Sequence, residues 1–213
     1  MLNIKKCTFA AKKNLKYPAN HFIEDDENIL RSLIEFFPLA TLVSVDKDNI
    51  HTSYLPFILD SSKDLIGHLD ANNPQVSLLQ NEKKVRLIFN GPEAYISPSH
   101  FPTNELPTYN YFKIEVDGIV KPIPDEDLKL AIIQLTTQLE GDEAAYKLTH
   151  DEKRLHSLVN YIYGFKVEVK QICGRFKMSQ DKSKAHQQTA LNLIQDNIVT
   201  RSKYFMETYW KQD

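Results

Sequence analysis

Hydrophobic positions in the first forty residues recur at helical spacing and then change to strand spacing. The helical pattern predicts a helix over 25–37, with Asp25 and Asp26 at its first turn and Pro38 directly after its end. The apolar stripe of this helix comprises Ile29, Leu30, Leu33, Ile34 and Phe37. Residues 39–45 and 50–59 then predict a hairpin, in which Pro56 belongs at an edge or a bulge.

The same alternation predicts further strands at 64–69, 85–89, 94–97, 112–117 and 165–178. In the last of them the apolar parity slips once near Gln171, which indicates a bulge. Between the strands, the proline-rich stretch 98–107 is predicted to be an ordered loop.

Helical patterns occupy the remaining segments and are predicted at 74–80 with Asn73 as its cap, 125–139, 151–162 and 183–198. Because the strands follow one another as hairpins, the order favours an α+β fold over a doubly wound one. We expect an antiparallel barrel or sheet with peripheral helices. One domain is predicted over 1–182, with a C-terminal helix and tail, 183–213, packed on it; residues 202–213 suggest no role.

Composition narrows the class of protein. Of 213 residues, 42% are hydrophobic and 25% are charged, so a packed core is expected. A net charge of −2 argues against direct DNA binding, which needs clustered cations. The sequence suggests neither a signal peptide nor a membrane span, and the two cysteines, Cys7 and Cys173, are interpreted as reduced thiols. A cytoplasmic protein is predicted.

Familiar catalytic and metal motifs are not found in the sequence. The histidines form no His-x-x-x-His pair, and there is no Cys-x-x-Cys, so no metal site is predicted. The six glycines form neither a P-loop nor Gly-x-Gly-x-x-Gly, and a phosphate would therefore be held by side chains and strand-end amides.

Two polar segments are candidates for ligand binding. Residues 91–111 place hydroxyls and a histidine beside aromatic rings, a combination suited to a small flat heterocycle. Residues 174–182 place Arg175, Lys177 and Ser179 where a strand ends before a helix, which suits an anion. The structural alternative is that the aromatic residues cover one end of a barrel and the cations are solvated.

These segments are also where the chain resembles the PaiB-like family, a branch of the FMN-binding split-barrel proteins. The resemblance extends over residues 17–190 and rests on motifs in the family's order and spacing. They are Tyr17-Pro18-Ala19-Asn20-His21-Phe22, Pro38 to Val43, Leu55-Pro56, Gly67-His68, Asn73-Pro74, Gly91 to Ser99, Pro107-Thr108, Asn110-Tyr111 and Phe176 to Gln180.

The resemblance implies an antiparallel split β-barrel that forms a homodimer, with FMN at the subunit interface. The residues implied to bind this cofactor are His68, Asn73, Ser97, Ser99, His100, Thr108, Tyr109, Asn110, Lys177, Ser179, Gln180 and Lys182. Among them Lys177 and Lys182 would face the phosphate, and His100 or Tyr109 could stack on the ring. Relatives are described as negative transcriptional regulators, which implies a regulatory role as well.

The chain departs from the family pattern at six positions, which are Tyr54, Ala71, His100, Tyr109, Glu115 and Asp181. An arginine is lost and two carboxylates are gained, so the local positive charge is lower. Three alternatives to a flavin-binding regulator therefore stay open. They are a cofactor-free scaffold, a binder of haem or another flat ligand, and a flavin-dependent oxidoreductase.

Overall fold

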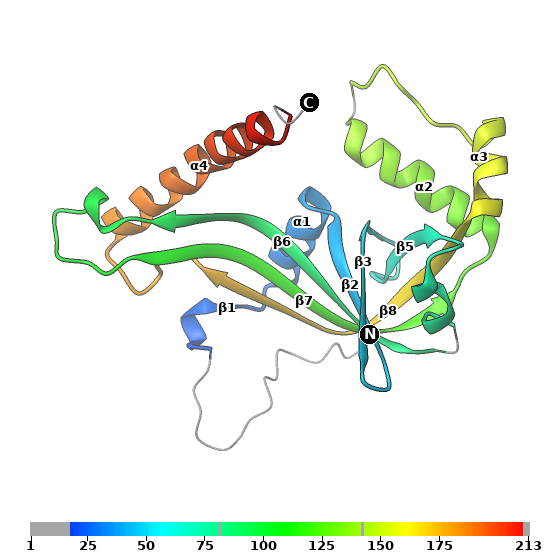
Figure 1. Ribbon diagram of the computed structural model, residues 1–213, viewed down its shortest axis with the longest axis horizontal. Coiled ribbons are helices and arrows are strands. Elements are labelled where there is room, and N and C mark those ends of the chain that lie inside the picture. Colours follow the sequence, from blue (N-terminus) through cyan, green and yellow to red (C-terminus); the bar gives the residue numbers. More distant parts are fainter. Residues whose placement is uncertain (1–17, 81, 142, 211–213) are drawn as a thin grey trace. The chain divides into compact units, whose positions relative to one another are not determined.

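A computed structural model describes residues 18–80, 82–141 and 143–210 of the chain (Figure 1). Its strands are β1 (Ile23–Glu24), β2 (Leu39–Asp46), β3 (Asn49–Pro56), β4 (Ile58–Leu59), β5 (Leu65–Asp70), β6 (Lys84–Ile96), β7 (Thr108–Pro122) and β8 (Ile162–Lys177). Its α-helices are α1 (Glu27–Phe36), α2 (Asp125–Glu140), α3 (Lys153–Leu158) and α4 (Lys184–Trp210). Short 3-10 helices lie at η1 (Asn20–Phe22), η2 (Pro74–Leu78), η3 (Pro98–His100) and η4 (Val159–Tyr161).

The strands form one antiparallel sheet in the order β3-β2-β6-β7-β8-β5-β4, and β1 pairs with β8. The long strands β6, β7 and β8 are neighbours in this order and dominate the view in Figure 1. Strand β3 ends the order on one side, so Pro56 lies on an edge strand as predicted.

The described residues fall into two compact units. We call Asp25–Phe89 together with Ile114–Cys173 the sheet unit, and 18–24, Asn90–Lys113 and 174–210 the arm unit. Strands β6, β7 and β8 contribute residues to both units. The predicted domain boundary at residue 182 falls inside the arm unit.

Each unit has its own buried apolar cluster. In the sheet unit, Phe57 meets Phe89 and Phe165 edge to face, with ring centroids 6.2 and 5.9 Å apart. In the arm unit, Ala94 and Ile96 of β6 pack with Ala190 and Ile194 of α4. Burial of these side chains is the main stabilising contribution of each unit.

Most predicted elements are confirmed. Helix α1 has Asp26 as its N-cap, whose carboxylate accepts hydrogen bonds from the backbone N–H groups of Asn28 and Ile29. The hairpin β2–β3, the 3-10 helix capped by Asn73, and α2 are also present. Burial in β8 changes from odd to even positions at Cys173 and Gly174, slightly after the predicted slip near Gln171, whose bulge stays a prediction.

Several predicted boundaries are wrong. The expected break at 90–92 lies within the continuous strand β6, where Gly91 and Pro92 mark only a change of buried parity, from Phe89 to Ala94. The predicted strand 50–59 is two strands, because Ile58 and Leu59 leave β2 and pair with β5. Helix α4 extends to Trp210, well beyond the predicted end at 198.

Two further predictions concern chemistry and location. Cys173 is buried and disulfide-bonded, which contradicts a reduced thiol at this position, whereas Cys7 lies outside the described residues. No helix in the described part of the chain has the length and apolar character that a membrane crossing requires.

Candidate functional site

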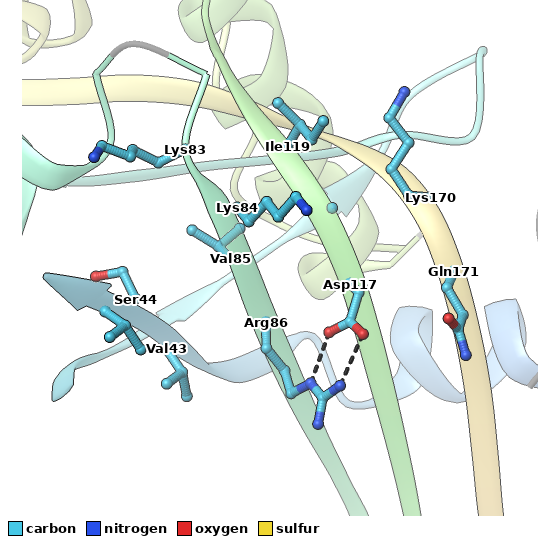
Figure 2. Close-up of a pocket in the computed structure, with 12 residues that line it drawn as sticks. Val43, Ser44, Lys83, Lys84, Val85, Arg86, Asp117, Ile119, Lys170 and Gln171 are labelled. Atoms are coloured by element: carbon cyan, nitrogen blue, oxygen red, sulfur yellow. Dashed lines mark hydrogen bonds and ion pairs between the residues drawn. The ribbon is translucent and has the colours of Figure 1, made fainter. Parts of the chain in front are cut away.

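A groove of about 940 Å³ lies in the sheet unit, over strands β2, β6, β7 and β8 (Figure 2). It is lined by Val43, Ser44, Val45, Lys83, Lys84, Val85, Arg86, Asp117, Gly118, Ile119, Lys170 and Gln171. The volume is at the upper end of the range typical of small-molecule sites.

Strand alternation explains which side chains meet in the groove. In β6, Val85 and Leu87 are buried in the core, so Lys84 and Arg86 point to the other face. Val43 of β2 is in register with Arg86, which places an apolar wall directly beside the guanidinium. In β7, Val116 and Gly118 are buried, and Asp117 and Ile119 face outward.

Gly118 allows the strands under the groove to approach closely. A Cβ atom at this position would lie 2.4 Å from Val167 Cγ1 and 2.7 Å from the carbonyl oxygen of Glu168. Any side chain would therefore push β7 and β8 apart. The floor of the groove depends on glycine here.

An ion-paired arginine lies in the groove. Arg86 Nε donates to Asp117 Oδ1 at 2.6 Å, and its Nη2 donates to Oδ2 at 2.7 Å, so the pair is bidentate (Figure 2). Arg86 Nη1 also lies 3.2 Å from Glu115 Oε2. The hydrogen bonds to Asp117, followed by the charges of Asp117 and Glu115, raise the pKa of Arg86 above its ordinary value.

Lysines supply the other positive charges. Lys84 extends from β6 toward β7, whereas Lys83 extends away from it (Figure 2). Within the described ranges, Lys84 has no ion-pair or hydrogen-bond partner for its ammonium group. Lys170 is paired with Glu168. Lys84 is therefore the groove cation best placed to meet an anionic ligand.

A buried amide supports the β2 side of the groove. Gln75 is almost fully buried under β2, and its Nε2 donates to Ser44 Oγ at 2.9 Å and to the carbonyl oxygen of His51 at 3.3 Å. Its Oε1 has no partner among the described residues. Ser44 is thereby fixed in one orientation at the groove wall.

Ten of the twelve predicted site residues lie in the arm unit and form several hydrogen-bonded groups. Lys177 Nζ donates to Thr108 Oγ1 at 2.6 Å, and buried Asn110 donates through Nδ2 to Ser179 Oγ at 3.0 Å. The Ser97 and Ser99 hydroxyls are 2.8 Å apart. The structure therefore pairs residues that are distant in sequence, as expected for a site or for a closely packed turn.

The other arm-unit candidates are held by local contacts. Gln180 Oε1 accepts the backbone N–H of Met178 at 2.7 Å. Lys182 Nζ donates to Glu105 Oε2 at 2.8 Å, and this hydrogen bond raises the pKa of Lys182. His100 is exposed, and Tyr109 is 40% exposed. Lys182 therefore already has a carboxylate partner, whereas Lys177 has a neutral one.

The remaining two candidates, His68 and Asn73, lie in the sheet unit, where their contacts hold elements of the fold together. His68 is packed between β5 and α2, near Leu128 and Ile132, and this burial lowers its pKa. Asn73 caps η2 through its side-chain oxygen and donates to Ser53 Oγ at 3.0 Å. Both contacts have a clear role in the fold.

None of the twelve predicted residues lines the groove, so sequence reasoning missed Lys84, Arg86 and Asp117. The sequence did contain a signal for these residues, namely the alternation of polar and apolar positions along the two strands. Polar residues Lys84 and Arg86 alternate with Val85 and Leu87, and Glu115 and Asp117 form the wet face of a strand. What the sequence could not show is that β6 and β7 are neighbours with these faces turned the same way.

Comparison with known proteins identifies the family. Residues 16–171 match the model of the family described as "Putative FMN-binding domain", and the chain belongs to this family. All twelve groove residues fall within the matched range. "Protease synthase and sporulation protein PAI 2" of Bacillus subtilis (strain 168) is 25% identical over 173 residues, covering 79% of this chain and 84% of that protein.

Solved structures confirm the predicted fold class, the antiparallel split β-barrel. The FAD and heme binding protein from Mycobacterium smegmatis matches with a TM-score of 0.60 at 13% identity, covering 79% of this chain and 80% of that one. The flavocytochrome Anf3 from Azotobacter vinelandii matches with a TM-score of 0.56 at 10% identity, covering 78% and 74%. At these identities the likeness concerns the fold alone.

Proposed function

We propose that the chain binds a flavin, FMN, in the groove of the sheet unit. The observation that carries this proposal is the combination of apolar walls with an unpaired cation. Val43, Val45 and Ile119 offer a surface for a flat ring system, and Lys84 offers a charge for a phosphate. The family description and the flavin named for both structural neighbours support the same ligand class.

The chemistry of the groove residues fits this ligand. Gln171 can hydrogen-bond to the polar edge of the ring or to ribityl hydroxyls, and Lys84 can contact the phosphate. Bound flavin would supply electron or hydride transfer, while the protein supplies binding and tuning. The arm-unit candidates, of which Lys177 with Thr108 is the most suitable for an anion, stay a prediction as a further set of contacts.

We also propose a homodimer that forms through the outer face of β2 and β3. Val45 and Ile50 are in register across the two strands and are 58% and 73% exposed. Leu39 and Tyr54 continue the same face. An exposed apolar face of this kind is typical of an interaction surface, and it adjoins Val43 of the groove wall.

A flavin-dependent oxidoreductase and a transcriptional regulator remain candidate roles for such a flavin-binding dimer. The name of the Bacillus relative refers to protease synthase and sporulation, which agrees with a regulatory role. Lys182, near the start of α4, is paired with Glu105, which reduces the positive charge that it could offer to DNA.

An FMN titration of the purified protein, followed by flavin fluorescence, tests the proposed site. We expect saturable quenching at one FMN per chain, and Lys84→Ala should weaken binding about tenfold because a charge-assisted hydrogen bond to the phosphate is lost. Lys153→Ala, which removes an exposed lysine of α3, is the matched control and should bind like the wild type.

Two results of the FMN titration would contradict the proposed site. Wild-type protein that fails to quench FMN at micromolar concentration contradicts the proposal. Equal weakening by Lys84→Ala and Lys153→Ala would place the flavin elsewhere. A haem titration in parallel separates the ligand classes, since a Soret shift without flavin quenching would favour a haem-binding scaffold.

A further inference from the structure

The charge balance around Arg86 is unusual for a groove that accepts an anion. Its guanidinium contacts two carboxylates, Asp117 through two hydrogen bonds and Glu115 at 3.2 Å. These three side chains together carry one net negative charge. We call Arg86, Asp117 and Glu115 the acidic clamp.

The clamp determines where a phosphate can bind. A phosphate brought to Arg86 would have to displace a bidentate carboxylate and would then lie next to two negative charges. Lys84 lies two residues earlier on the same face of β6, and no carboxylate of the described residues is paired with its ammonium group. The arginine is therefore unavailable to the ligand, although it is the cation with the best geometry for phosphate.

We propose that Glu115 is a specificity-determining residue that acts with Asp117 to exclude the ligand's phosphate from Arg86. The groove's preference for phosphorylated over neutral flavins is thereby reduced. This inference rests on the proposed flavin site and adds that the charges of its carboxylates determine which flavins it prefers. Glu115 and Asp117 have distinct parts in it. Asp117 fixes the position of the guanidinium through two hydrogen bonds, while Glu115 places a second carboxylate 3.2 Å from Arg86 Nη1.

Glu115→Gln is the informative change because Asp117 still holds Arg86 in place. The substitution removes the negative charge beside Arg86 Nη1 and leaves the cluster neutral, so a phosphate is repelled less, while an uncharged ligand gains nothing. We expect the affinity for FMN to rise about three- to tenfold, as for a partly exposed charge removed near an anion. The affinity for riboflavin, which has no phosphate, should stay within about twofold.

A matched control is available on the same two strands. Glu93 of β6 is paired with Lys113 of β7 at 2.6 Å, outside the groove. Glu93→Gln removes the same charge from a similar cross-strand pair, and its FMN and riboflavin affinities should equal those of the wild type. A gain in FMN affinity of the same size in both variants would overturn the inference, because it would reflect net charge alone.

Titration of both flavins into the three proteins separates the possible failures. If wild-type protein binds riboflavin and FMN but Glu115→Gln changes both affinities in parallel or neither, the clamp proposal is wrong and the flavin site stands. If wild-type protein binds neither flavin, the proposed function is wrong. The clamp is then tested with inorganic phosphate, while the Arg86 Nε–H resonance is observed by NMR. Phosphate that shifts this resonance in Glu115→Gln but not in the wild type supports the clamp, and equal responses overturn it.

Discussion

At the scale of single residues, buried polar side chains show where the arm unit is most constrained. Asn110 is fully buried, and its amide donates to the hydroxyl of Ser179. Ser179 itself adopts φ 60°, a left-handed backbone conformation that non-glycine residues rarely take. A strained turn of this kind is stable only when its surroundings hold it, and Asn110 provides that support.

Asn110→Ala should therefore destabilise the protein by about 1–3 kcal/mol, because Ser179 loses its partner inside the unit. Urea unfolding measured by circular dichroism gives this difference. Ser99→Ala removes a hydroxyl from the exposed pair with Ser97 and should change stability by less than about 0.5 kcal/mol. Equal losses in the two variants would mean that the buried hydrogen bond stabilises the protein no more than the exposed one.

At the scale of elements, the sequence predicted those segments whose periodicity is local. The α1 cap at Asp26 and the β2–β3 hairpin depend on residues close together in the chain. The groove residues were missed because they meet only where β6 lies beside β7, a pairing that no local pattern contains. A break was expected at Gly91-Pro92 because such residues usually end strands. In the structure, however, β6 continues through them from Lys84 to Ile96.

The packing of α2 on β5 gives the sheet unit a pH-dependent stability through His68. Burial lowers the pKa of His68, so the folded state prefers the neutral ring. The unfolded chain, with an ordinary histidine pKa of about 6.5, takes up a proton first as the pH falls. The stability associated with neutral His68 is thus present above this value and is lost as the pH falls through the lowered folded pKa.

His68→Gln should flatten the dependence of unfolding free energy on pH between about pH 5 and pH 7. Urea unfolding at several pH values measures this slope. His51→Gln is the control, since it removes a histidine from the edge strand β3, away from α2. An unchanged slope in His68→Gln would show that another group accounts for the acid sensitivity.

At the scale of the whole molecule, the proposed dimer and the proposed flavin site depend on the same strands. Val45 lines the groove and is also part of the exposed apolar face with Ile50. A second chain on this face would cover an apolar surface that water now contacts and would shield the groove from solvent. Dimer formation and flavin binding should then be coupled, because a ligand held at an interface binds the dimer more tightly than the monomer.

Ile50→Glu places a charge on the proposed interface and should shift the protein toward monomer in analytical ultracentrifugation, because an unpaired carboxylate would be buried. Leu106→Glu adds the same charge at an 87% exposed position of the arm unit and should leave the association state unchanged. FMN should partly restore the Ile50→Glu dimer if the flavin lies at the interface, since its binding free energy then favours association. Restoration would place the ligand between two chains. A monomeric wild type would contradict the interface, and a dimer that Ile50→Glu weakens but FMN does not restore would assign the groove to each chain alone.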